Sequence, residues 1–280
     1  MTLRIGIAGY GSWGRRHFES WKKVPSVEIA GIYDPAYQGE LFFRSLKELI
    51  QASEALDVVV PAKSLAEVGI QAIEAGRHAF LEKPVATNIE EAKRLARVAR
   101  DNPECMTMAG FIERFNPVFR KLNIIFKETG KPRTIFCQRS GAPTLVARQT
   151  GVLKDLAIHD IDLLRWMLGD PKSVSVHSSR SFHFGELELS FEETEALVIS
   201  DCLGPKIRRW IATFDDETLF AHFERNQWKL FQNGREITVA WVPPLEQELR
   251  YFAECLANGR PPSPSIDDAT RVLEIIEKAR

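Results

Sequence analysis

The feature that most constrains the fold of this chain is a short apolar strand followed at once by three spaced glycines. Arg4–Ala8 has the pattern of a buried strand, and Gly9, Gly11 and Gly14 come directly after it. In this arrangement the first glycine permits a tight turn, the second lets a phosphate approach the main chain, and the third lets a helix pack closely on the strand. Ser12–Lys23 is expected to form that helix, whose amino terminus offers N–H groups to an anion. The pattern predicts a dinucleotide-binding turn.

The first 110 residues repeat the order of strand and helix. Apolar runs of strand length alternate with amphipathic segments, as in a parallel sheet that is covered on both faces. Capping boxes at Ser64–Glu67 and Thr87–Glu90 mark two helix starts, and Gly76 ends the first of these helices. Such units predict a doubly wound α/β fold of the Rossmann type with right-handed crossovers. The expected strands are Arg4–Ala8, Glu28–Tyr33, Asp57–Val60, His78–Leu81 and Thr107–Gly110.

The pattern changes after about Arg114. The turn Asn233-Gly234 joins two strand-like runs as a hairpin, and this half predicts an α+β domain with an open, largely antiparallel sheet. We therefore expect two domains, residues 1–114 and 115–280. The expected strands of the second domain are Arg133–Arg139, Ser173–Ser178, Glu195–Cys202, Arg209–Phe214, Thr218–Phe223, Trp228–Gln232 and Glu236–Ala240. Its expected helices are Pro117–Glu128, Leu153–Leu168, Leu245–Ala257 and Asp267–Ala279, the last capped by Ser265.

Composition argues against several classes of protein. The 280 residues are 44% hydrophobic and 27% charged, and the formal net charge of −1 offers no overall attraction to nucleic acid or to an anionic membrane. The apolar runs are shorter than the roughly 20 residues that cross a bilayer, and the first residues lack the pattern of a secretion signal. The four cysteines form no Cys-x-x-Cys pair, so we expect reduced thiols in a cytoplasmic protein and no metal site.

A carboxylate is expected at the end of the second strand, where it can accept hydrogen bonds from the ribose of a bound dinucleotide. Asp34 stands at this place, directly after the strand Glu28–Tyr33. Its charge would repel the additional phosphate of NADP, and no arginine follows it directly. The sequence therefore favours NAD, with NADP as the alternative.

Lys83 follows the fourth strand in the run Glu82-Lys83-Pro84. Ligands of a doubly wound sheet bind outside the carboxyl ends of its strands, so Lys83 is expected to face that crevice. Pro84 restricts Lys83 to extended conformations, which helps to fix its direction. Partial desolvation would let the amine assist proton transfer or polarise a carbonyl group.

Asp155 and His159 lie four positions apart in an expected helix, which places them on one face with Cβ atoms about 6 Å apart. An imidazole can take the proton of an alcohol while hydride leaves its carbon, and Asp155 can orient the ring. Asp162 is a candidate partner behind this pair. The other histidines lack such neighbours and are interpreted as structural or surface residues; they are His17, His78, His177, His183 and His222.

In this order the motifs resemble the glucose–fructose oxidoreductase/inositol dehydrogenase family, usually called Gfo/Idh/MocA, over essentially the whole chain. The residues that carry the resemblance are the glycine turn with Asp34, Ala75–Pro84, Gly110–Pro117 and Asp155–Leu164. The resemblance implies an NAD(P)-binding Rossmann domain and a homodimer or homotetramer assembled through the carboxy-terminal sheet. It also implies that Lys83, Asp155 and His159 occupy the catalytic positions, with His159 as the acid/base. The expected cofactor contacts are Gly9, Gly11, Ser12, Trp13, Gly14, Asp34, Pro61, Glu82 and Lys83.

The expected activity is oxidation or reduction at a secondary hydroxyl or ketone of a sugar, nucleotide-sugar or cyclitol. The family commonly has a threonine–proline loop followed by a histidine after the third strand, whereas Val60 and Leu65 stand at those places here. This difference keeps open a reductase of a non-sugar substrate, similar to biliverdin reductase or dihydrodiol dehydrogenase. A catalytically inactive NAD(P)-sensing regulatory protein is the alternative from another class, and the joint presence of the three catalytic residue types argues against it. The short segment between Asp34 and Asp57 is expected to lack one helix.

Overall fold

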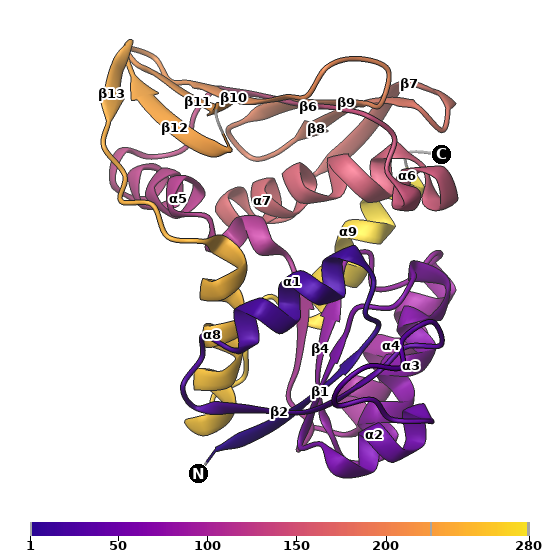
Figure 1. Ribbon diagram of the computed structural model, residues 1–280. Coiled ribbons are helices and arrows are strands. Elements are labelled where there is room, and N and C mark those ends of the chain that lie inside the picture. Colours follow the sequence, from indigo (N-terminus) through magenta and orange to yellow (C-terminus); the bar gives the residue numbers. More distant parts are fainter. Residues whose placement is uncertain (1, 225, 279–280) are drawn as a thin grey trace. The chain divides into compact units, whose positions relative to one another are not determined.

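The computed structural model describes residues 2–224 and 226–278 (Figure 1). The chain divides into two compact units, of which the first comprises Met1–Ile112 with Pro243–Arg271 and the second Glu113–Val242 with Val272–Arg280. The segment Pro243–Arg271 thus groups with the first unit, whereas the sequence prediction assigned it to one continuous second domain, 115–280. The division into domains 1–114 and 115–280 stays a prediction.

The first unit contains, within the described residues, a five-stranded parallel sheet of order β2-β1-β3-β4-β5. This confirms the predicted Rossmann-type sheet. Across it Ala8 pairs with Tyr33 and with Val58, and Leu81 pairs with Val58 and with Ala109. The carboxyl ends of neighbouring strands therefore reach the same edge of the sheet. The strands are β1 (Leu3–Ala8), β2 (Val27–Tyr33), β3 (Ala55–Val58), β4 (His78–Glu82) and β5 (Thr107–Gly110).

Helices lie on both faces of this sheet, with α1 beside α8 and α3 beside α4 (Figure 1). The helices are α1 (Ser12–Trp21), α2 (Leu46–Ala52), α3 (Ala62–Glu74), α4 (Ile89–Asp101), α8 (Pro244–Ala257) and the first part of α9 (Ile266–Lys278). The predicted end of the last helix at Ala279 lies outside the described residues. None of the helices in the described part of the chain is long and apolar enough to span a bilayer.

Two predicted capping boxes differ in detail from the structure. α3 begins at Ala62 directly after Pro61, so Ser64 lies inside the helix rather than at its start. The fixed backbone of proline fits the position before a first helical turn, and the sequence interpretation overlooked it. In α4 the cap is Asn88, whose side chain accepts the Glu91 N–H, one residue later than predicted.

The prediction that one helix is missing between Asp34 and Asp57 is wrong, because α2 occupies this segment. Ser45 caps α2 by accepting the Glu48 N–H at 3.2 Å. The run Ser45-Leu-Lys-Glu48 is itself a capping box, a signal that was present in the sequence. Before the helix, Phe42 forms a parallel bridge with Ile32 and so extends the sheet beyond β2.

The second unit contains, within the described residues, an eight-stranded sheet of order β13-β12-β11-β10-β6-β9-β8-β7. β6 and β9 pair in parallel and the other neighbours are antiparallel, which confirms the predicted open, largely antiparallel sheet. The predicted hairpin turn is present, with φ of 48° at Asn233 and 79° at Gly234. The strands are β6 (Thr134–Ser140), β7 (Ser173–Ser181), β8 (Phe184–Ser190), β9 (Glu195–Asp201), β10 (Ile207–Thr213), β11 (Thr218–Glu224), β12 (Gln227–Gln232) and β13 (Arg235–Ile237).

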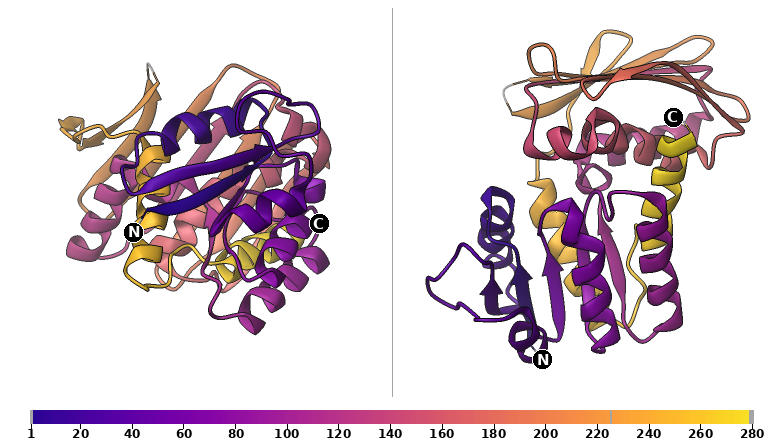
Figure 2. Two further views of the ribbon diagram at one scale, coloured as in Figure 1. Left: turned by 60° about the horizontal axis from the view of Figure 1, so that its bottom comes forward. Right: turned by 90° about the vertical axis from the view of Figure 1, so that its right-hand side faces the viewer.

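Helices cover one face of this sheet, and none of the helices in the described residues lies on the other face (Figure 2). On the covered face the ring of Phe119 in α5 lies 5.1 Å from Trp210 and 4.8 Å from Trp228. The predicted helix Leu153–Leu168 is divided, because its first part is a π-helical segment. The elements are the 3₁₀ turn η1 (Ile112–Phe115), α5 (Pro117–Thr129), α6 (Leu145–Thr150), the π segment η2 (Leu153–Ala157) and α7 (Ile158–Leu168).

Candidate functional site

The glycine turn leaves space where a dinucleotide would need it. Gly9 has φ of +100°, and a Cβ atom there would lie 2.5 Å from the Val59 carbonyl oxygen. A Cβ atom at Gly14 would lie 2.1 Å from the Gly9 oxygen, so this position holds α1 against the turn. At Gly11, by contrast, a Cβ atom would meet no atom within 4 Å. The first and third glycines are required by packing, and the second opens the main chain to a ligand.

The amino terminus of α1 is suited to an anion. Its cap, Gly11, provides no side chain to bind the first N–H groups, and the first turn of this fully described helix carries no acidic residue. Ser12 and Trp13 form the start of that turn. Helix N–H groups and the helix dipole together attract phosphate, so the turn and α1 fit the pyrophosphate of a dinucleotide.

Asp34 lies directly after β2 and is tied to the glycine turn. Its Oδ2 accepts the Tyr10 N–H at 2.7 Å, and its Oδ1 accepts the Ala36 N–H at 2.8 Å. The ring of Tyr10 lies 4.4 Å from that of Tyr37. A carboxylate oxygen accepts more than one hydrogen bond, so Asp34 retains capacity for ribose hydroxyls in this fixed position.

Pro61 follows β3, Glu82 is the last residue of β4 and Lys83 follows it, so all three lie at the same sheet edge. Glu82 is buried and its Oε2 accepts the main-chain N–H of Lys83 at 3.0 Å. Lys83 is half-buried, and the Lys83–Pro84 peptide bond is cis. The register of β1 to β4 therefore gathers the predicted cofactor contacts of the first unit at one edge, together with the predicted catalytic lysine.

A buried polar cluster that the sequence interpretation missed lies behind this edge. His17 is fully buried, with Nδ1 2.9 Å from Asp57 Oδ2 and Nε2 3.2 Å from Glu82 Oε1. Trp21 donates its indole N–H to Asp57 at 2.7 Å. The regular spacing of Trp13, His17 and Trp21 on one face of α1 was visible in the sequence, but the two carboxylates come from other strands.

Asp155 and His159 lie on the divided helix of the second unit. Asp155 is buried in η2 and accepts a hydrogen bond from the Thr144 hydroxyl at 2.5 Å. His159 is half-buried in the first turn of α7. The four-residue spacing thus crosses a change from π to α geometry, and single π turns occur frequently at functional sites. Thr144 is an additional candidate residue, since it fixes one oxygen of Asp155.

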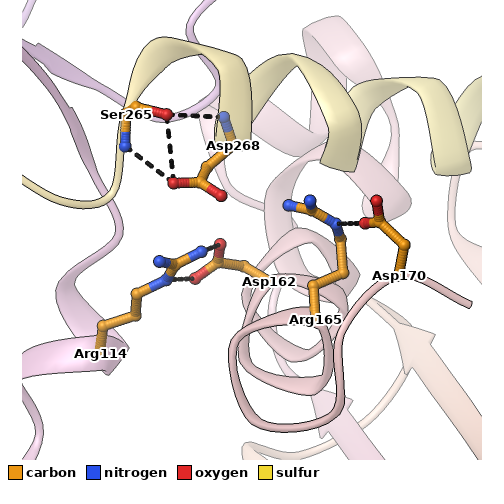
Figure 3. A network of polar contacts seen from close by, with 6 residues as sticks. All are labelled: Arg114, Asp162, Arg165, Asp170, Ser265 and Asp268. Atoms are coloured by element: carbon orange, nitrogen blue, oxygen red, sulfur yellow. Dashed lines mark hydrogen bonds and ion pairs between the residues drawn. The ribbon is translucent and has the colours of Figure 1, made fainter.

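Asp162, whose predicted role behind the Asp155–His159 pair stays a prediction, forms a buried ion pair with Arg114. Its two oxygens accept hydrogen bonds from Arg114, Nε at 2.8 Å and Nη2 at 2.6 Å, as Figure 3 shows. Both side chains are buried. Two parallel charge-assisted bonds of this kind fix an element in place, so Asp162 joins α7 to the segment that begins the second unit.

The structure thus places the predicted residues in two local groups. One group lies at the sheet edge of the first unit and the other on the divided helix of the second unit. The catalytic roles of Lys83, Asp155 and His159 and the cofactor contacts stay predictions. Within the described residues, no three histidine, cysteine, aspartate or glutamate side chains gather in a way that could hold a metal ion.

Comparison with known proteins agrees with this geometry. Residues 3–111 match the family described as "Oxidoreductase family, NAD-binding Rossmann fold", and residues 128–197 match the GFO/IDH/MocA C-terminal domain. The chain is 26% identical to the scyllo-inositol 2-dehydrogenase (NAD(+)) of Bacillus subtilis, over 98% of this chain and 92% of that one.

Solved structures show the same fold. One is the UDP-N-acetylglucosamine 3-dehydrogenase of Acidithiobacillus ferrooxidans, with a TM-score of 0.88 and 23% identity, covering 100% of this chain and 97% of that one. Another is a 3-ketoreductase of Actinomadura kijaniata in complex with NADP, with a TM-score of 0.86 and 18% identity, covering 100% of this chain and 97% of that one. Together with the two matched domains, these findings show that the chain belongs to the Gfo/Idh/MocA family of oxidoreductases, with an NAD-binding Rossmann domain.

Proposed function

We propose that this protein is an NAD(P)-dependent dehydrogenase or reductase that acts on a secondary hydroxyl or ketone of a sugar, nucleotide-sugar or cyclitol. The observation that carries the proposal is the gathering of the glycine turn, Asp34 and Lys83 at one edge of the parallel sheet. The named relatives act on an inositol and on a nucleotide-sugar, which supports this class of substrate.

In the proposed reaction His159 is the acid/base and Lys83 assists it. When the alcohol is oxidised, its C–H bond breaks and its O–H proton passes to the imidazole of His159, while Lys83 binds the oxygen on which negative charge develops. The bound nicotinamide supplies the hydride acceptor. Asp155, held by Thr144, orients His159 and stabilises the imidazolium. In the reverse direction His159 returns the proton to the ketone oxygen.

NAD is the proposed cofactor, because Asp34 is held beside the glycine turn by the Tyr10 N–H. A carboxylate fixed there would bind the ribose hydroxyls and would repel a phosphate on that ribose. The relatives support a nicotinamide cofactor without deciding between the two forms, since one is an NAD(+) enzyme and another was solved with NADP.

The test of the proposed function is a pair of titrations followed by a substrate panel. We expect NADH to bind at least tenfold more tightly than NADPH, measured by the quenching of tryptophan fluorescence. With NAD, a panel of inositols, free sugars and nucleotide-sugars should then give an increase in NADH absorbance with at least one polyol. Turnover of non-sugar ketones alone would favour the non-sugar reductase. Binding of NADH without turnover of any compound would favour the sensing protein.

We also propose that the protein forms a homodimer or homotetramer through the outer face of the eight-stranded sheet, the face without helices in Figure 2. The strand register aligns half-buried apolar side chains in a row across this face. A neighbouring row carries basic side chains towards β12, two of them paired with Glu224, and a carboxylate at β8. The apolar row is Phe231, Phe220, Ile211, Phe136 and Leu197, and the neighbouring row runs Lys229, His222, Arg209, Gln138, Ile199 and Glu186.

A two-fold axis lying between two such faces and parallel to the strands would set the Arg209 side of one copy against the Glu186 side of its partner, which favours self-association. We expect Ile211→Glu, at the centre of the apolar row, to halve the mass measured by light scattering, because a buried unpaired carboxylate opposes the interface. The control is Leu203→Glu, an exposed side chain in the turn after β9, which should leave the mass unchanged. Equal masses for Ile211→Glu and the wild type, both above the chain mass of 31.8 kDa, would place the interface elsewhere.

A further inference from the structure

We propose that His17 is a positioning residue that holds Glu82 in place at the end of β4 and, through Glu82, fixes the main chain of Lys83. The inference rests on the proposed function, in which Lys83 acts on the substrate. Nothing in the residue pattern of α1 assigned His17 a role, and its sequence interpretation was structural or surface.

One face of α1 contacts two carboxylates, Asp57 of β3 through hydrogen bonds and Glu82 of β4 at ion-pair distance. His17 is wedged between them, with Nδ1 2.9 Å from Asp57 Oδ2 and Nε2 3.2 Å from Glu82 Oε1. One helical turn further on, Trp21 donates to Asp57 at 2.7 Å. His17 is thus the side chain of this face that lies within ion-pair distance of both strands.

The electrostatic balance keeps His17 charged. Burial alone would lower the pKa of His17, but the Asp57 carboxylate, together with Glu82, outweighs burial and raises this pKa to about 10. Burial would raise the pKa of Glu82, but the hydrogen bond and charge of His17, with a hydrogen bond from Trp13 and the charge of Lys83, hold it below its usual value. The cluster therefore consists of an imidazolium between two buried carboxyl groups, of which Glu82 is ionised.

Glu82 passes this constraint to Lys83. While one of its oxygens faces His17, the other accepts the Lys83 N–H at 3.0 Å. Without the imidazolium, Glu82 would be a buried carboxylate that has lost a cation 3.2 Å from its oxygen, which favours movement towards water or uptake of a proton. Either change alters the acceptor of the Lys83 N–H and the charge beside the Lys83 amine. α1 also carries the glycine turn, so the same contact ties the cofactor-binding helix to the catalytic lysine.

Two substitutions of His17 and one matched control separate positioning from general stability. His17→Phe removes both polar contacts. His17→Gln keeps a polar side chain, but this side chain cannot contact both carboxylates as the ring does. The control is Trp21→Phe, which removes the hydrogen bond to Asp57 from the same helix face but leaves the His17–Glu82 contact. All three variants loosen the cluster, and two of them release Glu82.

The first readout needs no substrate. Trace acetylation of the wild type and the variants between pH 6 and 10, with the Lys83 peptide quantified by mass spectrometry, reports the reactivity of the Lys83 amine. We expect the Lys83 labelling rate at pH 7.5 to change at least about threefold in both His17 variants and to stay at the wild-type level in Trp21→Phe. A second readout is kcat with the substrate found by the panel, which should fall about 10- to 100-fold in both His17 variants, while NADH binding changes less than about threefold.

Unchanged Lys83 labelling in both His17 variants, or equal changes in Trp21→Phe, would overturn the proposal. Failure of the proposed function would look different, because the wild type would then turn over no compound of the panel while the labelling result still decides the role of His17. A wild type with turnover and a His17→Gln variant with unchanged labelling and kcat would remove His17 from the site and leave the function standing.

Discussion

His159→Asn is expected to lower kcat about 10²- to 10⁴-fold, the range that a positioned acid/base contributes. Asparagine fits the space of the imidazole but cannot accept the alcohol proton. Hydride transfer would then leave this proton, and with it a positive charge, on the substrate oxygen. NADH binding should change less than about threefold, because the glycine turn and Asp34 belong to the other unit. The measurement is NADH absorbance at saturating substrate, with a fluorescence titration of NADH on the same sample.

Lys83→Ala is the companion variant and should also remove turnover. A matched control is His78→Asn at the opposite end of β4, where the ring accepts the Met106 N–H at 2.9 Å at the amino edge of the sheet. This histidine lies away from the glycine turn, so turnover should persist in the control. Unchanged turnover in both His159→Asn and Lys83→Ala would refute the assignment of the catalytic residues.

The parts of the fold that could be predicted from the sequence are those with local signals. The glycine turn, the five parallel strands and the Asn233-Gly234 hairpin each depend on a few adjacent residues, and all are present. The predicted starts of α3 and α4 lie close to the observed ones, because the signals for a helix start are also local. α2 and β8 also had local signals, a capping box at Ser45 and strict alternation around Leu187 and Leu189, and were overlooked.

The buried polar contacts could not be predicted, because their partners are far apart along the chain. His17 lies 40 residues from Asp57, and Arg114 lies 48 residues from Asp162. A single sequence shows a histidine or an aspartate but not which charge it will meet after folding. The π segment η2 was predicted as ordinary helix, and Asp155 within it accepts a hydrogen bond from Thr144, 11 residues away.

We expect a second large effect, on stability, where a buried arginine pairs with two carboxyl groups. Arg139 of β6 is fully enclosed, and its Nε donates to Asp160 at 2.8 Å while its Nη1 donates to Glu113 at 2.8 Å. Trp210 also donates to Asp160, at 2.7 Å. Burial raises the pKa of Asp160 in spite of Arg139, whereas for Glu113 the charge of Arg139 outweighs burial and lowers the pKa. The arginine thus compensates two buried carboxyl groups.

Arg139→Met should therefore destabilise the second unit by about 3–5 kcal/mol, the cost of leaving one side of a buried ion pair without its partner. Hydrogen exchange of the peptides that cover β6 and β10, followed by mass spectrometry, measures this loss in the second unit alone. The deficit should shrink as the pH falls into the range where Glu113 and Asp160 take up protons, because their protonation removes the uncompensated charge.

The control for this variant is Arg133→Met, which removes another arginine that binds a carboxylate with two nitrogens. Arg133 contacts Asp215 at 2.9 and 3.0 Å, close to the distances at Arg139, but the side chains of Arg133 and Asp215 are both largely exposed. Water and salt screen such a pair, so its removal should change the rate of hydrogen exchange in β6 very little. Equal hydrogen-exchange rates in β6 of the two variants would contradict this expectation, because the two arginines bind their carboxylates at similar distances and differ in burial. The same comparison also bears on the candidate site, since Asp160 directly follows His159 on α7.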